Sequence, residues 1–477
     1  MDAHIETALL QGTIVELGSL LRGGRLTSAE ATAWYLARIE RHKGLNAVRE
    51  TNPRALDEAK AADAALAAGR DAGPLHGIPV LLKDNIFTAG MRTSAGCQAL
   101  KEFRPAQDAT LVKKLRAAGA VILGKTNLTE FADYVSDVMP SEFSGAGGVV
   151  KNPHGIRYDR GQGSSIGSAA SVAASLAPVA IGSETQNSIQ TPACYSSVVG
   201  FKPTVGLVSR AGVVPLVPSQ DSPGPLARSV ADAALVVNAL AGGDPRDSWS
   251  LLFTRNARPG SMTVDSLKGI RIGVPRRQQA ERADFQGVMP LFQAAIEKLA
   301  KAGATVLDPC DLPSADQLQD VRSSVFRTEF KAALNALLED NGAPCGIGSI
   351  DALIAWNEKH PEAIPYGQSL LQAAQATNGY ADPAYIADRA RDIALSLTGG
   401  IEAALDMHQV DVLIAPMGAA SKCTGKSGAP VIALPAGMNG DTPFGVTVYC
   451  RPGEDAKLLA IAEAMEKALG GRIVPKL

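Results

Sequence analysis

An alternation of short apolar runs with an amphipathic stretch constrains the fold of this chain most strongly. Residues 78–82 form an apolar run, residues 108–119 carry apolar side chains at helical spacing, and residues 120–124 form a second apolar run. Uninterrupted apolar runs of this length are typical of strands covered on both faces. Strand, helix and strand in this order predict a βαβ unit, and with it a sheet that has helices against both faces.

The same alternation continues along the chain. Helices are predicted at residues 14–22, 27–42, 230–240, 292–302 and 458–469, and strands at residues 177–181, 270–276, 304–307, 410–416 and 431–435. We therefore expect one large α/β domain over residues 1–477, with a mixed, mostly parallel central sheet. Residues 323–397 are mainly helical in pattern, and we expect them to form a helical layer or lid over the site.

Composition and charge narrow the class of ligand. The formal net charge is −2 with basic and acidic residues interspersed, so no basic face is available for nucleic acid. The chain has neither a signal-peptide pattern nor an apolar run of 18 residues, and its six cysteines show no metal-binding spacing. We expect a cytoplasmic protein that binds a small molecule, with no nucleic-acid or membrane partner, no metal and no cofactor. The oligomeric state is open, with a homodimer as one option.

Small and polar residues gather between positions 160 and 210. Ser164 and Ser165 lie in a loop flanked by glycines, and Ser188 follows an apolar run. Upstream, Lys83 comes directly after the first apolar run. Its ammonium group either reaches water or is desolvated, which would lower its pKa and allow it to act as a base near neutral pH. Serine nucleophiles with such a base attack carbonyl groups.

Histidine is the more usual partner of a serine nucleophile, but only His76 and His154 lie near these loops. Residues 163–167 also match the Gly-x-Ser-x-Gly string of α/β-hydrolases, with Ser165 at the centre and His360 or His408 as a later base. That nucleophile elbow requires an apolar strand directly before it, whereas residues 152–160 are polar and interrupted by proline. The pattern therefore favours serine with lysine.

Several segments together resemble the amidase signature family. They are residues 77–85 with Lys83, residues 124–131, residues 163–169 with the run Gly-Ser-Ser, residues 184–189, residues 200–204 and residues 221–225. They stand in the order of that family and extend over much of the chain. The resemblance implies a single α/β/α domain and hydrolysis of an amide or related C–N acyl bond.

The resemblance also implies roles for individual residues. Lys83 matches the lysine of the family, Ser164 matches its bridging serine, which is held through a cis peptide bond, and Ser188 matches its nucleophile. The backbone N–H groups of Thr185, Gln186, Asn187 and Ser188 would then form the oxyanion hole. In this mechanism Ser188 loses its proton through Ser164 to neutral Lys83 and forms an acyl-enzyme, which water hydrolyses.

Four positions depart from the family pattern, one of them Gln162, which stands where the family usually has a small residue. Gln186 and Asn187 stand where the family has Gly-Gly, and Ile166 stands where it has Gly or Ser. A requirement for positive φ would strain Gln186 more than Asn187. We expect specificity to reside here, with a substrate pocket formed by Tyr134, Ile166, Gln220 and Tyr366. For both tyrosines, aromatic packing under a lid is the alternative interpretation.

Within this family, weaker similarities in further segments of the sequence resemble the peptide amidase and aryl acylamidase branch more than the amidotransferase branch. The predicted function is therefore hydrolysis of a small amide, anilide or related C–N acyl bond, with water as co-substrate. The alternatives are the glutaminase subunit of a tRNA-dependent amidotransferase, a carbamate-cleaving enzyme, and a binding protein on a disabled amidase fold.

Overall fold

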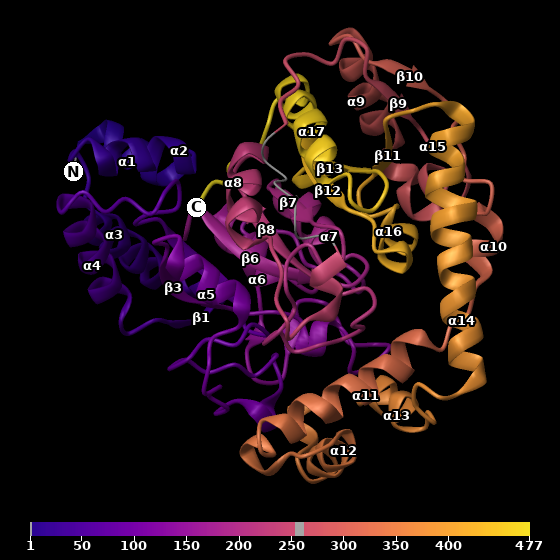
Figure 1. Ribbon diagram of the computed structural model, residues 1–477, viewed down its shortest axis with the longest axis horizontal. Coiled ribbons are helices and arrows are strands. Elements are labelled where there is room, and N and C mark those ends of the chain that lie inside the picture. Colours follow the sequence, from indigo (N-terminus) through magenta and orange to yellow (C-terminus); the bar gives the residue numbers. More distant parts are fainter. Residues whose placement is uncertain (1, 253–261) are drawn as a thin grey trace.

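A central sheet of eleven strands organises the computed structural model, which describes residues 2–252 and 262–477 (Figure 1). In sheet order the strands are β1 (Val48–Thr51), β3 (Val121–Thr126), β2 (Pro79–Lys83), β6 (Val179–Glu184), β8 (Ser222–Ala227), β7 (Val199–Lys202), β12 (Val431–Asn439), β13 (Thr442–Tyr449), β11 (Val412–Pro416), β9 (Arg271–Gly273) and β10 (Thr305–Leu307). A separate hairpin pairs β4 (Phe143–Ser144) with β5 (Gly148–Val149). The expected α/β fold with a mixed central sheet is confirmed.

Parallel pairing occurs on the two flanks of this sheet. On one flank β2 pairs with β3 and β6, and on the other β9 pairs with β10 and β11. The strands between these flanks, β8, β7, β12 and β13, pair antiparallel with their neighbours. The sheet is thus mixed, with less parallel pairing than the sequence predicts.

Helices cover both faces of the sheet. The N-terminal group comprises α1 (Ala3–Gln11), α2 (Ile14–Arg22), α3 (Ser28–Arg41), α4 (Ala55–Ala67) and α5 (Thr110–Ala117). Later helices are α6 (Ile166–Ala173), α7 (Gln190–Ser196), α8 (Val230–Leu240), α9 (Met289–Lys301), α10 (Ala315–Asp320), α15 (Ala403–His408), α16 (Ser421–Ser427) and α17 (Asp455–Leu469). α3 begins after a capping box in which Thr27 and Glu30 exchange hydrogen bonds. Helix α2 and helix α8 have the predicted bounds.

The segment 323–397 is helical, as predicted. It contains α11 (Val325–Asp340), α12 (Ile350–Lys359), α13 (Ser369–Gln375) and α14 (Pro383–Ile393), which extend along one side of the molecule in Figure 1. It contacts a loop beyond the sheet, where the Leu370 N–H donates to the Val135 carbonyl at 3.1 Å, and it contacts α16, where Lys426 forms an ion pair with Asp392. A lid function for this segment stays a prediction.

The carboxyl ends of β2, β3 and β6 meet at one edge of the sheet because the three strands run in parallel. The register places Leu82 opposite Ile181, so the end of β2 lies beside the end of β6. Ligand sites of open α/β sheets lie beyond such carboxyl ends. Among the residues described, we find no helix that combines the length and the apolarity needed to cross a membrane.

Candidate active site

Lys83, the last residue of β2, is fully buried and points its amine at hydroxyl groups. Its Nζ lies 2.7 Å from Ser164 Oγ, 3.0 Å from Ser183 Oγ and 3.1 Å from the Ser183 carbonyl oxygen. Burial lowers the pKa of Lys83 to about 7, and the more distant carboxylates of Asp221 and Glu184 act in the opposite direction. A large part of the Lys83 population is therefore neutral near pH 7.

Ser164 stands on the loop that precedes α6 and is fully buried. The peptide bond between Gly163 and Ser164 is cis, as the family resemblance implies. The next residue, Ser165, donates its backbone N–H to the Ser188 carbonyl oxygen at 3.0 Å. This bond joins the loop of Ser164 to the loop of Ser188, so the three residues predicted to react lie on adjoining segments.

The turn before Ser188 presents free backbone donors. Among the described residues, the N–H groups of Gln186, Asn187 and Ser188 have no acceptor within the protein. The next two N–H groups, of Ile189 and Gln190, donate to Glu184 Oε2 at 2.6 and 2.8 Å. Glu184 therefore holds the residues after Ser188 in place. The N–H groups of residues 186–188 stay free to donate to an oxyanion, as an oxyanion hole requires.

Gln186 and Asn187 are accommodated without unusual backbone. In the part of the chain that the structure describes, the residues with positive φ include neither of them. The Gln186 side chain donates to Gln220 Oε1 at 3.1 Å, and Asn187 Nδ2 donates to the Gly161 carbonyl oxygen at 2.5 Å. The strain that positive φ would impose on Gln186 is absent, and both side chains instead tie the turn to its neighbours.

Gly425 in α16 packs directly against the turn before Ser188. A Cβ atom added at Gly425 would lie 2.4 Å from Gln186 Cγ and 2.8 Å from the Thr185 carbonyl oxygen. Contacts this short are not tolerated, so only glycine fits opposite the turn. Gly425 therefore leaves space for the Gln186 side chain in the turn.

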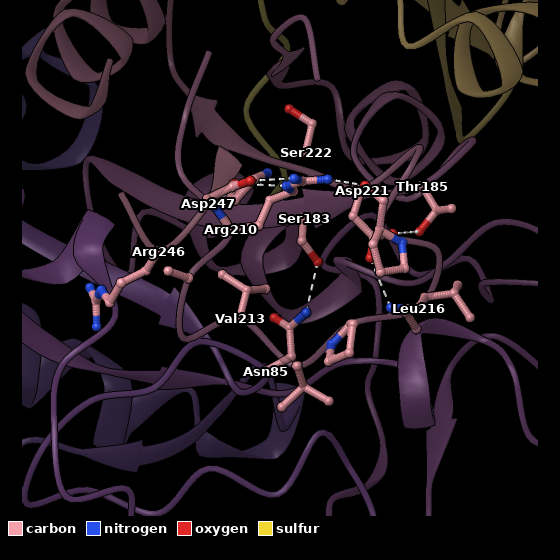
Figure 2. Close-up of a pocket in the computed structure, with 16 residues that line it drawn as sticks. Asn85, Ser183, Thr185, Arg210, Val213, Leu216, Asp221, Ser222, Arg246 and Asp247 are labelled. Carbon is pink, nitrogen blue, oxygen red and sulfur yellow. Dashed lines mark hydrogen bonds and ion pairs between the residues drawn. The ribbon is translucent and has the colours of Figure 1, made fainter. Parts of the chain in front are cut away.

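A pocket of about 200 Å³ lies beside Ser183 (Figure 2). We call it the Ser183 pocket; Asn85, Ser183, Thr185, Arg210, Val213, Leu216, Asp221 and Asp247 are among its lining residues. Asp221 accepts hydrogen bonds from the Thr185 hydroxyl at 2.6 Å and from the Leu216 N–H at 2.8 Å. Ser183 and Asn85 were not singled out by sequence reasoning, because their position depends on the register of β2 against β6.

The four residues predicted to contact substrate lie in different surroundings from one another. Tyr134 packs edge to face on Phe330 of α11, and Ile166 is fully buried at the start of α6. Gln220 is fully buried against Gln186, whereas Tyr366 is partly exposed beside Phe143. None of the four lines the Ser183 pocket. Their substrate contacts stay predictions, and the two tyrosines show the aromatic packing named as the alternative.

Together these features fit a hydrolase that attacks a carbonyl group: a buried lysine with a lowered pKa, two adjoining serine loops and backbone N–H groups without an acceptor among the described residues. Comparison with known proteins makes the class more specific. The family model "Amidase" matches residues 30–459, so the chain belongs to the amidase family. It is an amide-hydrolysing enzyme with the amidase signature.

Similar proteins support the same conclusion. The crystal structure of a peptide amidase from Stenotrophomonas maltophilia is 40% identical, with a TM-score of 0.90, over 97% of this chain and 98% of that one. A protein described as a probable amidase from Arabidopsis thaliana is 35% identical over 98% of this chain and 92% of its own length. One subunit of the glutamyl-tRNA(Gln) amidotransferase from Exiguobacterium sibiricum is 32% identical over 98% of this chain and all of its own length.

Proposed function

We propose that this protein hydrolyses a small-molecule amide or anilide through an acyl-enzyme on Ser188, with Ser164 as proton relay and Lys83 as base. The contact of 2.7 Å between Lys83 Nζ and Ser164 Oγ carries this proposal. A base must be within hydrogen-bond reach of the proton that it accepts, and its pKa must lie near the working pH. Lys83 meets both requirements, since burial lowers its pKa to about 7.

The proposed reaction has two stages. Ser188 Oγ attacks the carbonyl carbon while its proton passes through Ser164 to Lys83, and the oxyanion accepts hydrogen bonds from the N–H groups of residues 185–188. The C–N bond then breaks as the proton returns to the leaving nitrogen. Water, activated by the same pair, attacks the acyl-enzyme and releases the acid, which restores Ser188.

A comparison of two serines tests this assignment. The Ser188→Ala variant should lose hydrolysis of every amide that the parent protein cleaves, by a factor of about 10³ or more, and should not react with a fluorophosphonate. Ser165→Ala is the matched control, because Ser165 is the neighbouring buried serine and the centre of the Gly-x-Ser-x-Gly string. It should keep the labelling and lose activity by no more than about tenfold, because only the hydrogen bonds between Ser165 Oγ and Ser183 are removed. Labelling of Ser165 in place of Ser188 would refute the proposed nucleophile.

The substrate class requires its own experiment. Anilides, primary amides, amidated peptides, carbamates and glutamine should be offered to the parent protein, with Ser188→Ala as the blank. We expect turnover of small amides or anilides by the protein alone. Release of ammonia from glutamine only in the presence of a partner protein would instead assign the protein to the amidotransferases.

A further inference from the structure

Helix α14 carries two side chains that reach out of the segment 323–397. Arg389 and Asp392 are three residues apart, so they lie on the same face of the helix. The Asp392 carboxylate accepts a hydrogen bond from Lys426 Nζ of α16 at 2.6 Å, and both side chains of this ion pair are buried. The Arg389 guanidinium donates to two backbone carbonyl oxygens, that of Lys426 at 3.0 Å and that of Ser219 at 3.4 Å. These bonds join α14 to two segments outside its own.

The first of these two segments is α16, which packs against the turn before Ser188. Lys426 directly follows Gly425, and a Cβ atom added at Gly425 would lie 2.4 Å from Gln186 Cγ. In Figure 1, α16 lies between α14 and the strands of the sheet. Because packed side chains leave no free space between them, a displacement of Lys426 also displaces the glycine that contacts the turn.

The second segment contains Ser219 and Gln220. Gln220 is fully buried, and its Oε1 atom accepts a hydrogen bond from Gln186 Nε2 at 3.1 Å. Ser219 is also bonded to α11, since Glu329 accepts from the Ser219 N–H at 2.8 Å and from its hydroxyl group at 2.6 Å. The side chain of Gln186 is thus contacted from both of the segments to which Arg389 donates.

We propose that Arg389 is a positioning residue of the reaction, which holds the turn before Ser188 through Ser219 on one side and Lys426 on the other. The inference rests on the proposed function, in which N–H groups of this turn bind the oxyanion. In the part of the chain that the structure describes, Arg389 forms no hydrogen bond with Lys83 or Ser188. Donors of an oxyanion hole act because they are fixed before the reaction, so a looser turn lowers kcat more than it changes KM.

Two arginines of α14 provide a matched test. Arg389→Met keeps most of the apolar stem and removes the donors, so it should lower kcat about tenfold and change KM by less than about twofold. Arg391→Met is the control, because Arg391 bonds only to Asp388 and to the Arg322 carbonyl oxygen among the described residues. Its kcat should stay within about twofold of the parent. Equal losses of kcat in the two variants, or a change confined to KM, would overturn the proposal.

A double-mutant cycle tests whether Arg389 acts through Gln186. Gln186→Ala shortens the side chain that both segments contact, and it should itself lower kcat about tenfold. Adding Arg389→Met to this variant should lower kcat by less than about twofold further, because the contact that Arg389 supports is already lost. Two effects that multiply in full would overturn the assignment of Arg389 to this turn.

Hydrogen exchange separates this inference from the proposed function. The N–H groups of Ile189 and Gln190 donate to Glu184, and they should exchange about tenfold faster in Arg389→Met but at the parent rate in Arg391→Met. Unchanged exchange in Arg389→Met would overturn the hold of Arg389 on the turn. Faster exchange with an unchanged kcat would instead overturn the role of the turn in the reaction, which belongs to the proposed function.

Discussion

Lys83 and Lys125 lie near the carboxyl ends of two neighbouring parallel strands, β2 and β3. Their side chains contact different groups. Both are fully buried, and in the register of β2 and β3 Lys125 lies opposite Leu82, one residue before Lys83. Lys83 faces the hydroxyl groups of Ser164 and Ser183. Lys125 donates to the Ile86 carbonyl oxygen and to Thr93 Oγ1 at 2.9 Å, and its Nζ lies 3.8 Å from Asp84 Oδ1.

The difference shows that burial alone does not make a lysine reactive. Burial lowers the pKa of both side chains, that of Lys83 to about 7 and that of Lys125 to about 8. Both lysines contact hydroxyl groups, but the Ser164 hydroxyl beside Lys83 lies on the loop that is bonded to the loop of Ser188, whereas Lys125 also lies beside the carboxylate of Asp84, which stabilises its charged form. Lys83 is therefore suited to proton transfer and Lys125 to holding the loop that follows β2.

The largest effect should separate the two lysines by activity. Lys83→Met should lower kcat/KM by about a thousandfold or more, because a positioned base contributes about 10²–10⁴ to the rate. Lys125→Met should keep the activity of its folded fraction within about tenfold. Amide hydrolysis, normalised to folded protein by circular dichroism, measures both. Equal losses in the two variants would remove the distinction drawn between them.

Stability should separate them in the opposite direction. Lys125→Met should lower the free energy of unfolding by about 2 kcal/mol, because the buried acceptors of Lys125 lose their donor, while Asp84 keeps Arg49 at 3.5 Å. Lys83→Met should raise it by about 1 kcal/mol near pH 7, since Lys83 forms no ion pair within the described residues. Urea denaturation measures both values, and a loss of stability in Lys83→Met would contradict this assignment.

The pH dependence of stability follows from the same shift. Lys83 has a pKa of about 7 in the folded protein, below the ordinary value of 10.5 for a lysine. Between these values the unfolded chain binds more protons, so the free energy of unfolding rises with pH. The advantage of Lys83→Met over the parent should accordingly shrink between pH 7 and pH 10. An advantage that grew over this range would mean that the folded pKa of Lys83 is not lowered.

Removing one hydroxyl beside each lysine gives a finer comparison. Ser183→Ala takes away a contact of Lys83 and should lower kcat/KM by about 10–100-fold, with a displaced acid limb in the pH profile. Thr93→Val takes away a contact of Lys125 and should cost about 1 kcal/mol of stability, with the activity unchanged. If Ser183→Ala changed only stability, Ser183 would have no part in positioning Lys83.

The acid limb of the pH profile tests the same comparison in the parent protein. Because only neutral Lys83 can accept a proton, kcat/KM should fall about tenfold for each unit of pH well below its pKa of about 7, and should level off above it. Lys125→Met should show the same limb, since Lys125 takes no proton in the reaction. Full activity of the parent at pH 5 would exclude Lys83 as the base.

The periodicity of apolar residues predicted most of the helices and strands well. The prediction failed where residue preferences argue against the element that forms. Strand β8 contains Pro223 and Pro225, which argue against a strand in the middle of a sheet. Strand β7 pairs with β8 only at Leu226 and Ala227, so β8 has a single neighbour at its prolines and their missing N–H groups break no ladder on the open side. Such an interrupted pairing has no signature in a single sequence.

For the candidate site, too, one part could be predicted from the sequence and another could not. The family resemblance supplied Lys83, Ser164 and the cis bond before Ser164, because these lie within short motifs. It did not supply Glu184 as the residue that fastens the turn, nor Ser183 as a partner of Lys83, because both contacts follow from how strands and turns meet in space. Nor could it indicate that Gln186 faces a glycine far along the chain.

The packing of Gly425 against the turn also determines when the site can form during synthesis. The turn before Ser188 packs against Gly425 and is therefore completed by a helix that leaves the ribosome long after Ser188 does. A nascent or truncated chain would hold all three reacting residues and still lack the support that keeps the turn in shape. We expect a chain stopped before Ser421 to remain unlabelled by a fluorophosphonate, so that amide cleavage is acquired only after α16 has been made.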